Sequence, residues 1–214
     1  DPVTRTVTAL KIQARNPERV NVHLDGRYAF ALSLNIAQGL SQGQALSAGE
    51  IARLKAADQP AAAYHRALRF LARRRRSIHE TRNYLRRSGY PAAVVDAVIA
   101  RLRERRYLDD AEFARLWVAE RERFRPRSGR ALRWELRQKG VGGGEIDRAL
   151  SGLDEVASAR AALRGRLTRW QGLARQDFKA KVFGFLGRRG FSCEIAEAAF
   201  ETAWEERERP AAAE

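Results

Sequence analysis

The segment LRRSGY at residues 85–90 is repeated as LRQKGV at residues 136–141 and again as LGRRGF at residues 186–191. In each copy a leucine lies four positions before a glycine, and an apolar or aromatic residue follows the glycine. The three glycines are 51 and then 50 residues apart. A gap-free segment that returns three times at one period indicates a tandem repeat.

Each of these glycines has the sequence context of a residue that ends a helix. It follows a segment rich in Arg or Lys and precedes a new helix start. Glycine adopts the left-handed conformation there without strain, and cations in the last turn suit the helix dipole. Apolar positions beyond the glycines also match: Val95 with Ile146, and Ile99 with Leu150 and Phe200. Each repeat is therefore predicted to contain three helices, with the glycine after the second.

Other residues predict where these helices begin. Ser77 with Glu80, and Asp109 with Glu112, have the spacing of a capping box, and Pro91 lies near a helix start. Such units stack on their neighbours, so we expect a mainly α-helical protein whose repeats form an elongated, curved array. The predicted repeats span residues 64–107, 108–153 and 154–206, and a tail covers 207–214.

The first 58 residues have a different pattern, which predicts a small β-rich module. Apolar residues alternate through Val20–Leu24 and through Tyr28–Leu32, with Asp25-Gly26 between them. A DG pair flanked by alternating apolar residues is typical of a β-hairpin. Residues 6–14 fit a third strand with Thr8, Leu10 and Ile12 on one face. A short helix is expected from Ser47, because Glu50 completes a capping box.

The charge of the chain is strongly positive and is distributed with the same period. The 214 residues contain 41 Lys and Arg against 26 Asp and Glu, a formal net charge of +15. Residues 64–90 carry nine basic residues and one acidic, 121–139 eight and two, and 160–190 nine and one. The third helices at 141–155 and 191–208 are acidic instead. A periodic basic face suits a periodic anionic partner, although a solvated surface is the competing interpretation.

The sequence contains no recognisable catalytic or cofactor site. Its three histidines are isolated, and a lone Cys193 gives no CxxC or HxxxH spacing for a metal. Helix capping accounts for Asp109 and Glu112 without a catalytic role. Gly142–Gly144 is expected to be a helix connection and not an anion cradle. We therefore predict no enzyme, no metal and no cofactor.

The expected location is the cytoplasm. No run approaches the roughly 18 apolar residues of a membrane span, and no signal peptide is visible. A single cysteine suits a reducing compartment. We expect a monomer that binds no membrane.

The central part of the chain resembles a known family. The sequence YLDDAEFA at 107–114, followed by WVAER at 117–121, is similar to the signature of the RecX family of recombination regulators. LRWELRQKGV at 132–141 resembles the segment that follows it in the family, and KVFGFL at 181–186 the corresponding part of the third repeat. The N-terminal hairpin is similar to an extension found on many members.

This resemblance implies a negative modulator of the RecA recombinase, active in homologous recombination, DNA repair and the SOS response. Members are built from three-helix repeats, lie in the groove of the RecA–DNA filament, and dampen ATP hydrolysis, strand exchange and co-protease activity. They also bind single- and double-stranded DNA, and they have no catalytic residues to carry over. Phe113, Trp117, Leu136 and Gly140 match family positions whose expected role is structural.

Density and repetition, and not a motif, select the expected contacts with DNA or filament. They are Arg73, Arg74, Arg76, Arg82, Arg86, Arg125, Arg127, Arg130, Arg133, Arg137 and Lys139. Aromatic residues near them, Tyr84, Trp134 and Trp170, could stack on bases. Their spacing with neighbouring apolar residues favours core packing instead.

Two alternatives stay open. The chain could be a stand-alone helical DNA- or RNA-binding protein with helix-turn-helix units, but the helices after the glycines are acidic in two repeats, which argues against docking in a major groove. It could also be a helical enzyme whose site is unrecognised, which turnover assays would reveal.

Overall fold

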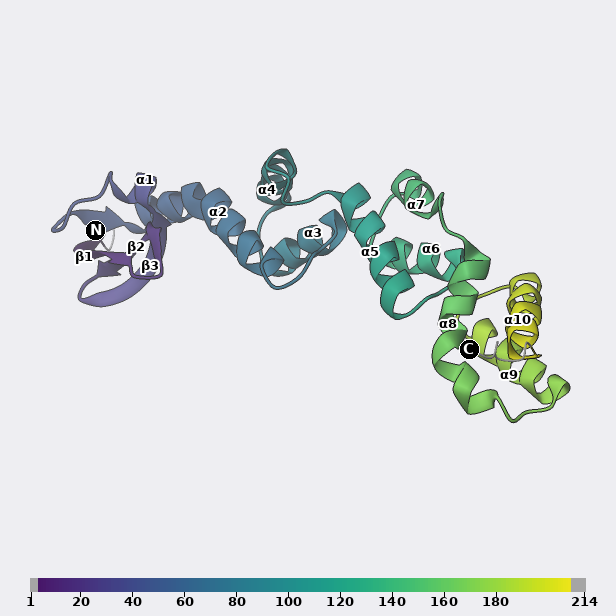
Figure 1. Ribbon diagram of the computed structural model, residues 1–214. Helices are drawn as coiled ribbons and strands as arrows, with labels where there is room; N and C mark the ends of the chain where they lie inside the picture. The colour runs from purple at the N-terminus through teal and green to yellow at the C-terminus, as the bar shows by residue number, and fades with distance from the viewer. Residues whose placement is uncertain (1–3, 209–214) are drawn as a thin grey trace. The chain divides into compact units, whose positions relative to one another are not determined.

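The structure is a computed structural model that describes residues 4–208. The chain divides into two compact units, the first containing residues 1–76 and 80–108 and the second residues 77–79 and 109–214. The first unit carries the strands, and helices make up most of the rest of the described chain (Figure 1). The predicted class, mainly helical with a small N-terminal β module, is confirmed.

The N-terminal module is built on one antiparallel sheet. Its strands are β1 (Thr4–Gln13), β2 (Asn16–Leu24), β3 (Arg27–Ser33) and β4 (Ala45–Ser47), in the order β3-β2-β1-β4. The predicted hairpin turn is confirmed, since Asp25 and Gly26 both have positive φ, 51° and 81°. The third strand is also confirmed. The fourth was not predicted, because three residues carry too short an alternation to be recognised.

Two of the alternating apolar residues of this sheet lie at its surface. Phe30 and Leu32 are buried, but Tyr28 is 60% exposed. The reason is a β-bulge in β3. Val22 of β2 pairs with Phe30, but the next residue of β2, His23, pairs with Tyr28, so the alternation of inward- and outward-facing side chains on β3 shifts by one residue. On β1 the register is also interrupted, and Ile12 is 62% exposed.

A long helix follows the sheet. After the short α1 (Leu34–Ala37), α2 runs from Ala48 to Leu71 and leads away from the strands (Figure 1). The capping box of Ser47 and Glu50 is confirmed, but the helix has 24 residues where a short one was expected. Pro60 lies inside it, a position where the missing N–H normally interrupts a helix. One continuous helix therefore joins the predicted module 1–58 to the first predicted repeat.

A buried ion pair fixes α2 to the sheet. Asp58 is 4% exposed, and its carboxylate accepts hydrogen bonds from Arg19 Nη1 at 2.7 and 2.9 Å and from the backbone N–H of Ser33 at 2.6 Å. Arg19 also donates to the carbonyl oxygen of Ala31 at 3.0 Å. The charge of Asp58 is thus compensated by a partner from β2 and an amide from β3.

The remaining helices follow the repeats. They are α3 (Ile78–Arg87), α4 (Ala92–Glu104), α5 (Asp110–Phe124), α6 (Gly129–Gln138), α7 (Gly143–Leu150), α8 (Glu155–Trp170), α9 (Arg175–Gly187) and α10 (Cys193–Glu208). In the second unit, α5–α7 and α8–α10 form two three-helix groups (Figure 1). Of the predicted tail, residues 209–214 lie outside the described residues.

The repeated glycines end helices as predicted. Gly89, Gly140 and Gly190 have φ of +86°, +72° and +89°. The residue after each glycine donates its N–H back to the carbonyl oxygen of the repeated leucine, for example Val141 to Leu136 at 3.1 Å. This is the Schellman arrangement, which satisfies carbonyls at the end of the helix.

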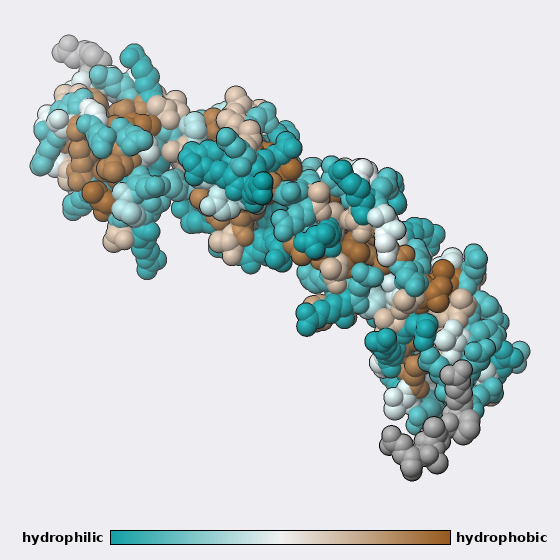
Figure 2. Space-filling model, turned by 45° about the horizontal axis from the view of Figure 1, so that its top comes forward, coloured by the Kyte–Doolittle hydropathy of each residue, from teal (hydrophilic) through white to brown (hydrophobic). Residues whose placement is uncertain are grey.

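Each three-helix group of the second unit has its own core. Phe113, Leu132, Leu136 and Ile146 belong to the core of α5–α7. The core of α8–α10 contains Phe178, Val182, Leu186 and Phe200 among others. Hydrophilic residues cover much of the face shown in Figure 2, with apolar side chains in separate patches between them.

Candidate nucleic-acid and filament interface

The candidate contacts lie on the second helices of the first two repeats, α3 and α6, on the segments that precede these helices and, for Lys139, at the C-cap of α6. In the described part of the chain, several of them are exposed and have no carboxylate within ion-pair distance. These are Arg73, Arg86, Arg125, Arg130 and Arg137. Arg130 makes one long hydrogen bond, 3.5 Å, to the carbonyl oxygen of Gly190. These guanidinium groups are available to an anionic partner.

Four other candidates are held in ion pairs. Arg74 pairs with Glu80 at 2.8 Å, and Arg127 pairs with Glu135 at 3.0 Å.

The other two pairs join the second helix of a repeat to its third helix. Arg82 on α3 contacts Asp96 on α4, and Arg133 on α6 contacts Asp147 on α7. An external phosphate would have to compete with these carboxylates, so the paired arginines are weaker candidates than the exposed ones.

Two candidate cations pack against aromatic rings. The Arg76 guanidinium lies 4.1 Å from the centroid of Phe70, and Lys139 Nζ lies 5.3 Å from the centroid of Trp117. Burial lowers the pKa of Arg76 from its ordinary value, and the charge of Arg74 lowers it further. The aromatic contacts give these two side chains a role in packing the helices.

The aromatic residues near the basic helices divide into two kinds. Tyr84 stacks on Phe70 with ring centroids 4.0 Å apart, and Trp170 packs against the core of the third repeat, so core packing is confirmed for both. For Trp134 the same expectation is wrong, because its side chain is 62% exposed. On α6 it lies four residues after Arg130 and three before Arg137, which places all three on one helix face. This face combines an exposed ring with two guanidinium groups that have no carboxylate at ion-pair distance within residues 4–208.

The structure also brings together residues that were not predicted from the sequence. Arg123 and Phe124 at the end of α5 line a hollow together with Arg164 and Arg166 of α8 and Arg189. Phe124 is 71% exposed. The signal was present in the sequence RERFRPR at 121–127, where a phenylalanine is placed among arginines.

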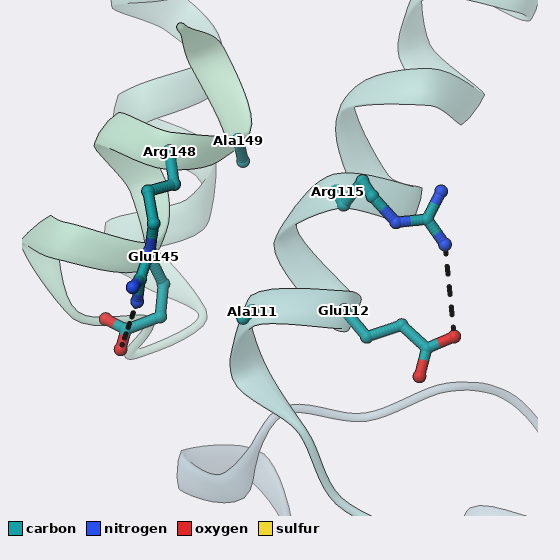
Figure 3. Close-up of a pocket in the computed structure, with 6 residues that line it drawn as sticks. All are labelled: Ala111, Glu112, Arg115, Glu145, Arg148 and Ala149. Atoms are coloured by element: carbon teal, nitrogen blue, oxygen red, sulfur yellow. Dashed lines mark hydrogen bonds and ion pairs between the residues drawn. The ribbon is translucent and has the colours of Figure 1, made fainter.

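A second hollow is lined by charged residues that neutralise one another. It measures about 470 Å³ and lies between α5 and α7 (Figure 3). Its charged lining residues form two ion pairs within their own helices, Arg115 with Glu112 at 4.0 Å and Arg148 with Glu145 at 3.4 Å. The paired charges cancel, and we assign this hollow no role.

The acidic residues of the LDD segment cap helices. Asp109 accepts from the backbone N–H groups of Ala111 and Glu112 at 2.9 and 3.1 Å, so its predicted role at the start of a helix is confirmed. Asp110 accepts from the N–H of Ile78 at the start of α3 at 2.9 Å. A carboxylate at this end of a helix satisfies an otherwise unpaired amide and suits the dipole.

The glycine run begins a helix. Gly142 is the N-cap residue of α7, and Gly143 and Gly144 form its first turn. Residues 4–208 contain no group of three or more His, Cys, Asp or Glu side chains arranged to hold a metal ion. In the same range no helix is long and apolar enough to cross a lipid bilayer.

Family models match the chain in four places. The N-terminal domain of regulatory protein RecX matches residues 5–47. The first, second and third three-helix domains of RecX match residues 63–102, 109–150 and 154–200. These matches cover most of the chain and follow the order of its repeats.

Curated relatives and solved structures agree with these models. The regulatory protein RecX of Bacillus subtilis (strain 168) is 30% identical over 200 residues, which cover 91% of this chain and 76% of the relative. That of Bacillus pumilus is 28% identical over 207 residues, 94% of this chain and 79% of the relative. A crystal structure of regulatory protein RecX superimposes with a TM-score of 0.65 at 27% identity, covering 92% of this chain and 99% of that one. The RecX structure from Lactobacillus salivarius has the same fold, with a TM-score of 0.60 at 19% identity over 71% of this chain and 97% of that one. The repeats, the glycine caps and these matches together show that the chain belongs to the RecX family of regulatory proteins.

Proposed function

We propose that the chain is a negative regulator of the RecA recombinase that binds the RecA–DNA filament. Bound there, it lowers ATP hydrolysis, strand exchange and co-protease activity. Membership in a family of regulatory proteins supports this proposal. The observation that carries it is that each of the first two repeats has an exposed arginine with no ion-pair partner among residues 4–208, Arg86 on α3 and Arg137 on α6 at equivalent positions.

The proposed mechanism is occupancy of the filament groove. A filament presents phosphates and protein subunits at a regular spacing, and a chain whose cations recur at a regular interval of its sequence offers a contact from each repeat. Arginine is the dominant cation, and its planar guanidinium binds a phosphate or a carboxylate with two parallel hydrogen bonds. A chain bound in this way would exclude a second DNA duplex and restrain the subunit motions of the ATPase cycle.

The proposed interface consists of the eleven basic residues and Trp134. The exposed arginines supply most of the attraction, and the ion-paired ones contribute only where a phosphate displaces a carboxylate. The same side chains would give the chain an affinity of its own for single- and double-stranded DNA. The proposed regulator acts as a monomer in the cytoplasm, without a cofactor.

The second candidate function is binding of DNA or RNA without RecA. One observation speaks against a helix-turn-helix reader: the third helices of the second and third repeats, α7 and α10, carry more acidic than basic residues. A recognition helix needs polar groups that read base edges, and an acidic helix is repelled by the phosphates that flank a groove.

The test is the DNA-dependent ATPase of RecA, titrated with this chain at fixed salt and with DNA in excess over both proteins. Filament binding predicts inhibition at amounts well below one chain per RecA subunit. Competition for DNA alone predicts that inhibition disappears as more DNA is added. That second result, with DNA binding intact, would refute the proposal in favour of stand-alone DNA binding.

A further inference from the structure

The hollow that contains Phe124 has the composition of an anion-binding site. It has a volume of about 700 Å³ and lies between the end of α5, the middle of α8 and the end of α9. Its lining includes four arginines, Arg123, Arg164, Arg166 and Arg189, against one acidic residue, Glu122. The arginines come from three separate segments of the sequence, and two of them lie on α8.

The positive charge of this hollow is not neutralised within residues 4–208. In that range none of its four arginines has a carboxylate within ion-pair distance. Arg189 is held in place, because its Nη1 donates to the carbonyl oxygen of Pro126 at 2.9 Å and its guanidinium lies 4.6 Å from the centroid of Phe185. Arg166 lies near the same ring, at 5.4 Å. Rings and carbonyls position these cations but leave their charge uncompensated.

The surroundings of Arg189 show the same excess. Burial lowers the pKa of Arg189 from its ordinary value, and the nearby charges of Arg125, Arg127 and Arg166 lower it further. Of these neighbours, Arg127 is paired with Glu135. An anion bound in the hollow would relieve the repulsion among the rest.

The second feature of the hollow is an exposed aromatic ring. Phe124 is the last residue of α5 and is 71% exposed, the largest exposed fraction among the large apolar side chains described. The Arg123 guanidinium lies 4.9 Å from its centroid. The residues of α8 that line the same hollow are small, Ala161, Ala162 and Gly165, and a Cβ at Gly165 would have no other atom within 4 Å. The hollow therefore combines an exposed ring with a wall of small residues.

We propose that this hollow binds one nucleotide unit of single-stranded DNA, with its base stacked on Phe124 and its phosphate held by Arg164, Arg166 and Arg189. A phosphodiester supplies the missing negative charge, and every base has a face that can stack on an aromatic side chain. Duplex DNA fits the ring less well, because its bases are already stacked on one another. This inference rests on the proposed function, because it names the residues of the chain that bind single-stranded DNA.

The test uses the full chain without recombinase and a fluorescently labelled oligo(dT), which forms no duplex. Fluorescence anisotropy then gives the affinity at several salt concentrations. Phe124→Leu keeps an apolar side chain but removes the ring, and it should weaken binding about tenfold without changing the salt slope. Arg164→Gln with Arg166→Gln should instead make the slope shallower by about 0.7 for each phosphate that the variant no longer binds. Binding to a duplex of equal length should be unchanged by Phe124→Leu.

The matched control is Tyr107→Leu, which removes another exposed ring, 55% exposed and outside the hollow. It should leave oligo(dT) affinity at the wild-type value, and circular dichroism should show that both variants are folded. Wild-type affinity for oligo(dT) in Phe124→Leu would overturn the inference. It would also be overturned if polyglutamate, an anion without bases, displaced oligo(dT) at an equal concentration of charge.

The result separates this site from the proposed function. If Phe124→Leu loses oligo(dT) affinity while the wild-type chain has no effect on the RecA ATPase, the site is supported and the proposed function fails. If the ATPase is inhibited but oligo(dT) affinity does not depend on Phe124, the proposed function stands and the site is wrong.

Discussion

Arg133 of α6 forms an ion pair with Asp147 of α7, and Arg82 of α3 forms the same pair with Asp96 of α4, 51 residues earlier. Each pair joins the second helix of a repeat to its third helix. The side chains are about one-third to two-thirds exposed, so such a pair contributes little to stability. Its larger consequence is electrostatic, because a carboxylate neutralises an arginine that would otherwise be free to bind the proposed anionic partner.

Neutralising the acidic member of this pair should therefore strengthen DNA binding. Asp147→Asn removes the partner of Arg133 and leaves its guanidinium available to a phosphate. We expect a higher affinity for duplex DNA and a salt slope steeper by up to about 0.9, the value for one added phosphate contact. Fluorescence anisotropy over a series of salt concentrations measures both.

The control for this prediction is Asp177→Asn, which changes the net charge by the same amount. Asp177 is exposed in the first turn of α9 and, among the described residues, has no ion-pair partner. Its replacement frees no arginine, so the slope should stay at the wild-type value. Equal changes in the two variants would mean that only net charge matters and that Arg133 is not a contact.

The exposed arginines of the proposed interface should carry much of the salt dependence. Replacing Arg73, Arg86, Arg125 and Arg137 together by Gln removes four cations that have no ion-pair partner in the described part of the chain. If each contacts one phosphate, the slope for duplex DNA should become shallower by about 3 to 4. Inhibition of the RecA ATPase should then require correspondingly more protein.

A matched variant replaces four exposed arginines outside the second helices. These are Arg15, Arg27, Arg53 and Arg103. The total charge change is identical, but we expect a much smaller change in slope and in inhibition. Indistinguishable results for the two sets would show that the basic second helices are a solvated face without a specific contact.

Much of the fold could be predicted because its signals are local. A glycine that ends a helix, a DG turn between alternating strands and an acidic or hydroxyl cap each depend on a few adjacent residues. Features that depend on pairing across the chain could not be predicted in this way, as the bulge that exposes Tyr28 shows.

One repeated element was also not predicted: Leu153-Asp154-Glu155 corresponds to Leu108-Asp109-Asp110. Glu155 accepts from the N–H of Gly129 at 3.0 Å, just as Asp110 accepts from that of Ile78.

The candidate interface was predictable only as a region. Charge density along the sequence locates the basic helices, but the partner of each arginine depends on side chains from other elements. Arg127 is paired with Glu135 of α6, whereas Arg125, two residues before Arg127, is exposed and unpaired among the residues described. The hollow around Phe124 needs α5, α8 and α9 together, and no single segment of sequence contains it.

The glycines that end the helices differ in how closely other atoms surround them. Replacing them with alanine should therefore reduce the free energy of unfolding by different amounts. At Gly140 a Cβ would lie 2.3 Å from His79 Cβ, whereas at Gly89 nothing lies within 4 Å. Both have positive φ, so Gly89→Ala should cost about 1–2 kcal/mol in free energy of unfolding from the left-handed conformation alone. Gly140→Ala should cost more, because the backbone or His79 must also move.

Gly143→Ala is the control for these two. Gly143 begins α7, and a Cβ at this position would have no other atom within 4 Å. Alanine there should be neutral or should stabilise the chain by up to about 1 kcal/mol. Urea unfolding followed by circular dichroism compares all three, and an equal cost at Gly140 and Gly89 would show that the contact with His79 is absorbed without penalty.

The buried pair of Arg19 and Asp58 should be costly to break from one side. Asp58→Ala leaves the Arg19 guanidinium, 12% exposed, without its carboxylate and leaves the Ser33 N–H without its acceptor. We expect a loss of about 3–5 kcal/mol in the stability of the N-terminal module. Asp58→Asn keeps an acceptor for Ser33 and should lose less. Hydrogen exchange of the β2 and β3 amides reports on this module alone, and wild-type protection in Asp58→Ala would contradict the prediction.

The hairpin turn should depend on pH through Asp25. The side chain of Arg5 donates to its carboxylate at 2.9 Å and the backbone N–H of Thr6 does so at the same distance, and these bonds lower the pKa of Asp25 below its ordinary value of 3.8. A lowered pKa in the folded state means that the carboxylate stabilises the turn above the unfolded pKa, and that this contribution disappears as pH falls through the folded pKa. Asp25→Asn tolerates the positive φ but cannot form the charged bonds, so the Thr6 amide should exchange faster than in the wild type at neutral pH. The exchange rates of the Thr6 amide in the two chains should become equal in strong acid. A wild-type Asp25 carboxyl resonance that titrates at the ordinary pKa would contradict this account. So would an Asp25 titration that is unchanged in Arg5→Ala.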